Sequence, residues 1–443
     1  MTKRPQQPPA AVPETAKQAG NVRARWAWTE AAVWTDRMLT ALEKGVKGDQ
    51  WFSLIDKVAG ESNLFVSSCR VARNKGAPGI DRVTVDQFAK HQAKHLKRLH
   101  KTIQDGSYVP HEVRRTWIPK PGSKEKRPLG IPTVRDRVVQ TSLRNVIEPI
   151  FEKDFAEHSY GFRPNRGCKD ALRVVAQLVK SGYVHVVDAD LKAYFDTIPH
   201  DKLMARIREK ISDGRVLELI EKFLKQGVME GLATWTPESG CPQGAVVSPL
   251  LSNIYLDPLD HQMAACGFKM VRYADDFVIL CRSREEAEAA MAMVQAWTEA
   301  GGLTLHPEKT VIVDAREEGF DFLGYHFHGE HRWPRKKSLR KLKEAIRAKT
   351  RRAHGHSLTY IIGDVNQTLR GWFEYFKHSH RWTFRPLDCW IRMRLRSILR
   401  KRRKGQGRGR GLDHLRWPNQ FFAERGLFSL VTAHHSACQS STR

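Results

Sequence analysis

The sequence lacks any apolar run that approaches the ~18 residues needed to cross a bilayer, and its N-terminus lacks the apolar core of a signal peptide. It also has few cysteines. The seven that are present are scattered and never form a Cys-x-x-Cys motif, so reduced thiols are expected rather than disulfides or a zinc site. No internal repeat is visible. These absences argue against a membrane protein and a disulfide scaffold, and they predict a protein of the cytosol.

Acidic residues are also scarce. Aspartate and glutamate total 48 against 75 lysines and arginines, which gives a formal net charge of +27. The cations concentrate in residues 120–127, 332–352 and 392–410, and a tryptophan lies in or beside each of the last two blocks, Trp333 and Trp390. A surface of this kind attracts a polyanion, and aromatic rings add stacking to phosphate contacts. The composition therefore predicts a nucleic-acid partner.

Two adjacent carboxylates, Asp275 and Asp276, stand between the two short apolar runs of residues 270–280, a pattern typical of a β-hairpin with the acids at its tip. Taken alone, an Asp-Asp pair is more often a simple turn. Their repulsion is relieved if a divalent cation binds, and Mg²⁺ prefers a few carboxylates together with substrate phosphates. Residues 183–190 form a second apolar run, which ends in Asp190. If the two strands are neighbours, Asp190, Asp275 and Asp276 form a two-metal site for in-line attack on a phosphate.

Three segments resemble one known family, and they occur in that family's order. The Tyr-Ala-Asp-Asp sequence at 273–276 resembles the signature hairpin of reverse transcriptases, residues 190–196 resemble their other metal-binding strand, and residues 240–256 are similar to their Pro-Gln-Gly segment. The resemblance implies an α+β right-hand polymerase built of fingers, palm and thumb. It also implies an RNA-directed DNA polymerase, a nucleotidyltransferase that uses two Mg²⁺ ions, with Mn²⁺ as an alternative, to join dNTPs to a primer.

Residues 118–132 place cations on both sides of a Pro/Gly turn, as a hairpin that closes over a triphosphate would. By resemblance, Lys120 and Arg127 are the triphosphate contacts. The spacing is one residue longer than the family's pattern, so Lys124 or Lys126 could take the place of Lys120. Without the resemblance, lysines in such a turn are usually solvated.

The sugar of the incoming nucleotide has one candidate contact. Phe195 lies five residues beyond Asp190 and matches the family's steric-gate position, where an aromatic ring excludes a 2′-hydroxyl. Its neighbour Tyr194 is the alternative, because alternation along a strand would let only one of the two face the sugar. The resemblance also assigns Gln243 to the dNTP site. Gly244 lets the backbone approach the template–primer duplex, since glycine has no Cβ.

The loop at 159–168 resembles the family's template-side element. Arg163 and Arg166 are its candidates for contact with template phosphates, and Tyr273 is the candidate contact of the hairpin with the template–primer duplex. The aromatic residues of the loop, Tyr160 and Phe162, either pack beneath the template or belong to the core.

Composition and pattern divide the chain into five segments. They are a disordered segment at 1–25, a helical extension at 26–100, fingers and palm at 101–330, a basic helical thumb at 331–404 and a short basic DNA-binding tail at 405–443. Residues 74–81, 370–376 and 387–392 resemble the upstream motif and the thumb or maturase domain of bacterial group II intron proteins. The tail resembles that of members without an endonuclease domain, such as class C, because it offers too few metal-ligating residues for a His-Asn-His nuclease.

The basic face of the thumb is expected to hold structured intron RNA through its backbone and shape. Its candidate contacts are Arg347, Arg351, Arg394, Arg396 and Arg400. The resemblance thus predicts a reverse transcriptase and maturase of the bacterial cytosol, close to the nucleoid. Its partners would be group II intron RNA, template RNA, primer DNA, dNTPs and a DNA target. Two alternatives stay open: a domesticated reverse transcriptase that serves defence or repair, and a non-enzymatic RNA-binding splicing factor.

Overall fold

The computed structural model describes residues 22–119, 126–231, 233–353 and 355–440. The predictions for residues 1–21, Lys120 and Lys124 therefore lie outside the described residues. The chain forms two compact units. The first comprises residues up to 171 together with 187–279 and 285–311, and the second comprises 172–186, 280–284 and the residues from 312 onward. None of the helices in the described chain has the length and apolarity needed to cross a bilayer.

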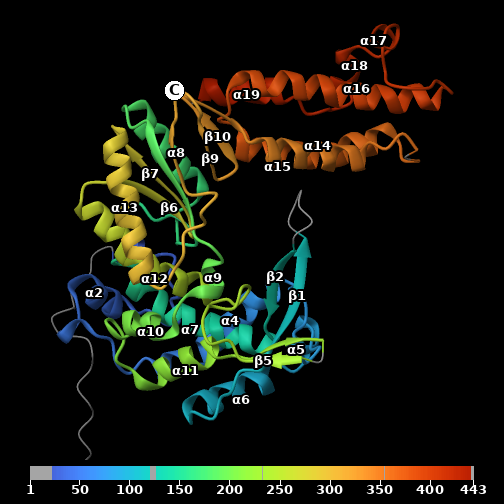
Figure 1. The fold of residues 1–443 in the computed structure, drawn as a ribbon. Helices are drawn as coiled ribbons and strands as arrows, with labels where there is room; N and C mark the ends of the chain where they lie inside the picture. The colour runs from blue at the N-terminus through green and yellow to red at the C-terminus, as the bar shows by residue number, and fades with distance from the viewer. Residues whose placement is uncertain (1–21, 120–125, 232, 354, 441–443) are drawn as a thin grey trace, which may run out of the picture. The chain divides into compact units, whose positions relative to one another are not determined.

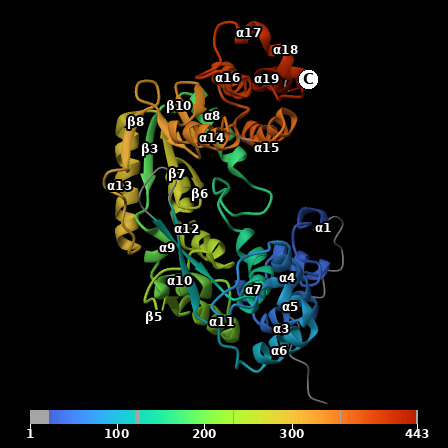
Figure 2. The ribbon, with the colours of Figure 1, turned by 90° about the vertical axis from the view of Figure 1, so that its right-hand side faces the viewer.

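The N-terminal part of the first unit is a group of helices around one buried helix, α7 (Val134–Glu152). The group consists of α1 (Val22–Arg25), α2 (Asp36–Lys44), the 3-10 turn η2 (Lys47–Asp49), α3 (Ile55–Ala59), α4 (Glu61–Arg73), α5 (Val85–Lys90) and α6 (Gln92–Gln104). Figure 2 shows α3, α4, α5 and α6 gathered beside α7. The Trp34 indole N–H donates to the Asn145 carbonyl over 3.0 Å. The predicted helical extension therefore shares a core with the fingers, and helix α1 falls where a disordered segment was predicted to reach residue 25.

The fingers sheet has the strand order β2-β1-β4-β5. Strands β1 (Val113–Pro119) and β2 (Lys126–Ile131) run antiparallel, with Arg114 opposite Ile131 and Pro119 opposite Lys126. Strand β1 is parallel to β4 (Val228–Glu230), which pairs with β5 (Ala233–Trp235). The hairpin predicted for residues 118–132 is thus confirmed, and Figure 1 shows it as two long teal arrows.

The palm sheet has the strand order β6-β7-β3-β8. Its strands are β3 (His185–Asp190), β6 (Lys269–Tyr273), β7 (Asp276–Cys281) and β8 (Val311–Asp314). Every residue of β7 after its first is buried, as is typical of an interior strand. The two apolar runs that carry the aspartates are therefore neighbouring strands. The accompanying helices are α8 (Cys168–Lys180), α9 (Tyr194–Thr197), α10 (His200–Arg208), α11 (Gly214–Leu224), α12 (Ser248–Ala265) and α13 (Arg284–Ala300).

The C-terminal part of the second unit joins a small antiparallel sheet to a helical bundle. The sheet has the order β11-β10-β9 and consists of β9 (Phe320–Phe322), β10 (Tyr325–His328) and β11 (His331–Pro334). The bundle consists of α14 (Lys336–Lys349), α15 (Leu358–Phe376), the 3-10 turn η3 (Arg381–Thr383), α16 (Phe384–Arg402), α17 (Asp413–Arg416), α18 (Asn419–Ala423) and α19 (Leu430–Ser440). Ile361, Val365 and Leu369 are buried along one face of α15, as expected of a helix within the helical segment predicted for residues 331–404.

The residues after 404 belong to the same core as the helices before them. Trp417, Phe422 and Leu430 are buried in one cluster with Ile346, Leu369 and other apolar residues of α14, α15 and α16. Helix α19 packs along α16 (Figure 1). The boundary predicted between a thumb and a separate tail is therefore not a break in packing, because the apolar residues of the tail complete the bundle.

Candidate active site

The turn between β6 and β7 presents the adjacent carboxylates, Asp275 and Asp276. Ala274 takes the left-handed backbone conformation there (φ 60°), and β7 begins at Asp276. The completely buried Arg272 holds this turn, because its guanidinium donates to the Ala274 carbonyl (2.9 Å) and to the Asp260 carboxylate (Nε–Oδ1 2.8 Å). Sequence reasoning gave Arg272 no role. Its position next to the Tyr-Ala-Asp-Asp sequence was the only available signal.

Asp190 and Asp275 line one cavity of about 880 Å³ within the first unit. Asp190 is the last residue of β3, so the palm sheet brings the two acids to the same cavity. Asp276 lies directly beside Asp275, but it is not among the lining residues. Other walls come from the fingers hairpin, from α9, from the Pro-Gln-Gly segment and from residues 306–309.

Three acids line this cavity, Asp190, Asp196 and Asp275, and two of them, Asp190 and Asp275, are the predicted metal ligands. Burial raises the pKa of the Asp275 carboxyl, the charge of Asp190 raises it further, and the Arg127 guanidinium opposes the shift. A cation already stands against the other acid, since Lys309 Nζ lies 2.6 Å from Asp190 Oδ2. Carboxylate oxygens are the ligands that Mg²⁺ prefers, and a bound cation relieves the repulsion between neighbouring carboxylates. Asp190 and Asp275 therefore fit a divalent cation.

The three-carboxylate set remains a prediction. Within the described ranges, no group of three or more His, Cys, Asp or Glu side chains is close enough to hold one ion. Asp276 itself takes part in an interaction within the protein.

Lys309 and its neighbours have no counterpart in the sequence-based predictions. The Lys192 N–H donates to the Thr304 carbonyl (2.8 Å), and the His306 N–H donates to the Asp190 carbonyl (2.7 Å). These bonds attach residues 304–306 to the end of β3, and both His306 and Lys309 line the cavity. The short alternation of apolar and polar residues at 303–306 was the signal that could have found this segment.

Gln243 connects the fingers to α9 through its side-chain amide. Arg127 Nε donates to Gln243 Oε1 over 3.0 Å, and Gln243 Nε2 donates to Asp196 Oδ2 over 3.0 Å. Arg127 and Gln243 both line the cavity, as their predicted dNTP contacts require. Asp196 also had no predicted role. An amide that accepts on one side and donates on the other orients the arginine above the cavity.

Tyr194 and Phe195 occupy a short helix, α9, so the alternation predicted from a strand is wrong. Ala193 before them is left-handed (φ 50°), and it ends the extended segment. The Tyr194 hydroxyl points into the core and donates to the Ser252 carbonyl over 2.6 Å. Phe195 packs edge-on against Tyr194, with the ring centroids 5.5 Å apart, and lines the cavity. Phe195, unlike Tyr194, is not held by a side-chain hydrogen bond to the core, and it is the better candidate to face the sugar.

Arg163 lines the second cavity described below, but its guanidinium is engaged inside the protein, so the predicted phosphate contact stays a prediction that its burial disfavours. Only 2% of its side chain is exposed, and its guanidinium pairs with Glu152 over 2.8 Å. The same guanidinium donates to three backbone carbonyls, including that of Ser159 at 2.9 Å. Arg166 differs, because its side chain is partly exposed and lies 5.8 Å from the centre of the Tyr160 ring. Arg166 remains a candidate template contact.

Two glycines allow the backbone to approach closely at this site. A Cβ on Gly161 would lie 2.2 Å from the Ala274 nitrogen, so the loop at 159–168, called the template loop after its predicted role, packs directly on the carboxylate turn. A Cβ on Gly244 would lie 2.4 Å from the Gly130 carbonyl, and its φ of +106° favours glycine. Gly244 is therefore required for contact with β2 as well as for any approach to a duplex.

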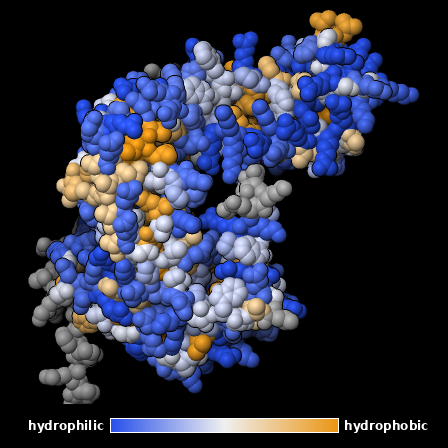
Figure 3. Space-filling model, viewed as in Figure 1, coloured by the Kyte–Doolittle hydropathy of each residue, from blue (hydrophilic) through white to orange (hydrophobic). Residues whose placement is uncertain are grey.

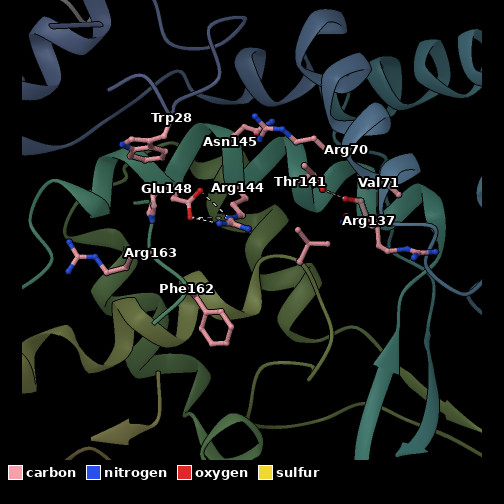
Figure 4. A pocket seen from close by; sticks show the side chains of 13 residues that line it. Trp28, Arg70, Val71, Arg137, Thr141, Arg144, Asn145, Glu148, Phe162 and Arg163 are labelled. Carbon is pink, nitrogen blue, oxygen red and sulfur yellow. Dashed lines mark hydrogen bonds and ion pairs between the residues drawn. The ribbon is translucent and has the colours of Figure 1, made fainter. Parts of the chain in front are cut away.

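A second cavity, of about 560 Å³, lies between α4, α7 and the template loop (Figure 4). Arg137 and Arg144 line it from positions two turns apart on α7, and Arg70 lines it from α4. Glu148 is its only lining acid, and it pairs with Arg144 over 2.6 Å. Figure 4 shows the Phe162 ring at its edge. Phe162 is 46% exposed and lines both cavities, so it stands between the carboxylate site and an arginine-rich space.

The thumb arginines predicted to bind RNA fall into two groups. Arg347 and Arg351 are exposed, and Arg394 and Arg400 are partly exposed. Arg394 donates to the Thr350 carbonyl over 2.8 Å. The Arg400 guanidinium donates to Asp413 Oδ2 over 2.6 Å, so Arg394 and Arg400 already have partners within the bundle.

Arg396 belongs to the interior, and its predicted RNA contact is wrong. It is 3% exposed, and its guanidinium donates to the Trp417 carbonyl (2.8 Å) and to Asn419 Oδ1 (2.8 Å). The guanidinium also lies 5.2 Å from the centre of the Phe422 ring. Arg396 thus holds the residues after 404 against α16.

Known proteins are similar to this chain in two consecutive regions. Residues 118–327 match the family "Reverse transcriptase (RNA-dependent DNA polymerase)", and residues 339–417 match "Group II intron, maturase-specific domain". The second match continues past residue 404, as the shared core of α16 and Trp417 does.

Three relatives extend these matches. Protein YkfC of Escherichia coli (strain K12) is 33% identical over 356 residues, which cover 71% of this chain and 87% of YkfC. Group II intron-encoded protein LtrA of Lactococcus lactis subsp. cremoris is 41% identical over 198 residues, which cover 44% of this chain and 32% of LtrA. An uncharacterized 91 kDa protein in the cob intron of Schizosaccharomyces pombe is 32% identical over 270 residues, covering 48% of this chain and 33% of that protein. With a reverse transcriptase domain followed by a maturase domain, the chain belongs to the group II intron-encoded reverse transcriptase and maturase family.

Proposed function

We propose that this chain copies RNA into DNA, and that it binds a group II intron RNA to assist splicing and target-primed reverse transcription during intron mobility. The observation that carries the proposal is one cavity that contains two palm carboxylates, a fingers arginine and an aromatic ring beside them. A polymerase needs these groups together to bind a triphosphate and select its sugar. The proposed partners are intron RNA, template RNA, primer DNA, dNTPs and a DNA target, in the bacterial cytoplasm beside the nucleoid.

Asp190, Asp275 and Asp276 are the proposed ligands of two Mg²⁺ ions, with Mn²⁺ as an alternative. When bound, these ions would stabilise the entering and leaving oxygens as the primer 3′-hydroxyl displaces pyrophosphate from a dNTP. The Lys309 ammonium lies 2.6 Å from Asp190 Oδ2. A cation is therefore already favoured beside this carboxylate, which supports the assignment.

The remaining cavity residues position the nucleotide. Arg127 presents its guanidinium to the triphosphate, and Gln243 holds that guanidinium in place. Phe195 closes the space beside the sugar and excludes a 2′-hydroxyl. Charge provided in advance by a fixed arginine costs no reorganisation when the transition state forms. Lys120, outside the described residues, is proposed as a second triphosphate contact.

The template strand is proposed to pass Phe162. Arg166, Tyr273 and Gly244 would contact the template–primer duplex on the side of the first cavity. Beyond Phe162, the arginines of the second cavity would hold the backbone of the template that has not yet been copied. Arg163 supports this path from inside the protein by its ion pair with Glu152.

Intron RNA is proposed to bind the exposed cations of the second unit, with Arg347 and Arg351 as the leading contacts and Arg394 and Arg400 beside them. Folded RNA is bound mainly through its backbone and shape, for which exposed arginines suffice. A splicing factor without polymerase activity is disfavoured, because the acids, the arginine and the aromatic ring of the cavity are all present.

Primer extension tests the polymerase. The purified chain should extend a DNA primer on an RNA template with dNTPs and Mg²⁺, and Asp275→Asn should not. A filter-binding assay at physiological salt tests the maturase, since the chain should bind its intron RNA more tightly than a length-matched control. Extension without RNA preference would leave only the reverse transcriptase, and absence of extension by a folded protein would refute the polymerase.

A further inference from the structure

Two leucines at one end of the second unit are unusually exposed. Leu412 is 75% exposed and Leu415 is 79% exposed, the largest fractions among the large hydrophobic residues that the structure describes. Leu412 directly precedes α17 and Leu415 lies within it, so a spacing of three places both on the same side of that turn. Figure 3 shows this end as a small orange knob on a blue surface.

The knob is held rigidly. Asp413, between the two leucines, is 5% exposed and accepts a hydrogen bond from Arg400 Nη1 over 2.6 Å and one from the Arg410 N–H over 3.1 Å. The Gly409 N–H donates to Ser397 Oγ over 3.1 Å, and a Cβ on Gly409 would lie 2.5 Å from the Arg396 Cβ. The leucines are therefore kept in solvent by contacts to α16, and their exposure does not come from a loose loop.

The charge around the knob has one sign. The segment that carries the two leucines also carries exposed cations, namely Arg402, Arg403, Lys404, Arg408, Arg410 and Arg416. The only acid between residues 401 and 416 is Asp413, which is buried and paired with Arg400. Such a set of cations selects a polyanion, and it would repel a second copy of the same basic surface.

We propose that Leu412 and Leu415 form a wedge that enters the minor groove of duplex DNA at a base step, while the surrounding arginines contact the phosphates on either side. Apolar side chains inserted between base pairs, flanked by arginines, are a known means of kinking DNA. Duplex RNA fits less well, because its shallow minor groove presents 2′-hydroxyls to the leucines. The proposal rests on the proposed function, in which a DNA target is a partner, and it names how that duplex is gripped.

The experiment uses the full chain and a short DNA duplex with 2-aminopurine at a single flexible TA step and a fluorophore pair at its ends. Wild-type protein should raise the 2-aminopurine fluorescence and shorten the end-to-end distance. The double variant Leu412→Ala/Leu415→Ala should lose both signals and bind this duplex about tenfold more weakly. Val109→Ala, a change at another exposed apolar side chain (65% exposed), is the matched control and should behave as wild type.

A second set of variants, which removes cations instead of leucines, distinguishes the wedge from the phosphate contacts. Replacing Arg408, Arg410 and Arg416 with alanine should weaken binding to DNA and RNA duplexes alike and reduce the salt slope by about 3. Primer extension on a primed RNA template should be the same in the leucine variant as in wild type. If the wild-type protein itself does not extend the primer, the proposed polymerase is refuted and the proposed wedge is not. Equal fluorescence in wild type and leucine variant would overturn the proposal. The proposal would also be overturned if the leucine variant still distorted DNA but no longer formed a dimer, or no longer bound anionic vesicles, as wild type did.

Discussion

Gln243 donates a hydrogen bond from its side-chain amide to the Asp196 carboxylate over 3.0 Å, and the same amide accepts one from Arg127. The carboxylate therefore determines which end of the amide faces the arginine. Without Asp196 the amide could rotate and present its NH₂ group to the guanidinium, which repels it.

The first prediction concerns this chain of contacts. Asp196→Ala should raise the KM for dNTP about tenfold, a cost of ~1.4 kcal/mol, with a smaller change in kcat, because it loosens Arg127 without removing it. Steady-state primer extension measures both constants. Glu238→Ala is the control, since this exposed acid lines a neighbouring cavity without joining the chain of contacts. An unchanged KM in Asp196→Ala would mean that Arg127 needs no support.

The second prediction concerns the metal ligands. Asp275→Asn should abolish DNA synthesis, because a neutral amide cannot offset the charge of two divalent cations. Thermal unfolding should change little, since Arg272 holds the turn through the Ala274 carbonyl. Binding of intron RNA should be retained, because it depends on the second unit. Robust synthesis by this variant would remove Asp275 from the metal site.

The third prediction concerns sugar selection. Phe195→Val should increase incorporation of rNTP relative to dNTP, because the volume that excludes the 2′-hydroxyl disappears. Tyr194→Phe is the matched variant: it should leave that ratio unchanged and lower the free energy of unfolding by about 1 kcal/mol, through loss of the hydrogen bond to Ser252. A shifted ratio in Tyr194→Phe alone would transfer the gate to Tyr194.

The fourth prediction separates the two arginines of the template loop. Arg163→Ala should destabilise the protein by about 3–5 kcal/mol, because it leaves Glu152 without its buried partner. Arg166→Ala should leave the unfolding temperature nearly unchanged and weaken binding of primed template. Denaturant unfolding and template titration distinguish them. A stable Arg163→Ala protein with weakened template binding would restore the template contact.

The fifth prediction concerns intron RNA. Replacing Arg347, Arg351 and Arg352 with alanine should reduce the salt slope of intron RNA binding by about 3, because these exposed side chains are free to contact phosphates. Extension of a simple primed template should fall less. Arg396→Ala should instead lower thermal stability, since its guanidinium holds the Trp417 carbonyl. Equal losses in both assays for the triple variant would indicate a thumb that grips any duplex.

Local patterns were enough to predict the elements that carry the chemistry. The apolar runs that end at Asp190 and flank Asp275 are neighbouring strands, and the cations of residues 118–132 lie on a hairpin. These features depend on periodicity and turn residues over a few positions, which a single sequence displays. The family motif then assigned residues such as Phe195 to the site, and Phe195 lines the same cavity as Asp190 and Asp275.

Contacts between distant residues were not predictable in this way. Arg163 was assigned to template phosphates by resemblance and Arg396 to the basic face that binds RNA, but each has a partner that only the fold supplies, 11 and 21 positions away. The ion pair of Lys309 with Asp190 joins residues 119 positions apart. A charged residue's partner, and hence its role, depends on tertiary packing that the residue's own neighbourhood does not encode.

The buried pair of Arg272 and Asp260 has a consequence for the timing of the reaction cycle. Since a cation that never leaves the protein holds the carboxylate turn, the turn keeps its shape between rounds of nucleotide addition. The carboxylates that would hold divalent ions are thus already in position before a nucleotide binds, without any refolding of the palm. Between additions only the ions and the substrate would need to exchange, because the palm that binds them would keep its conformation.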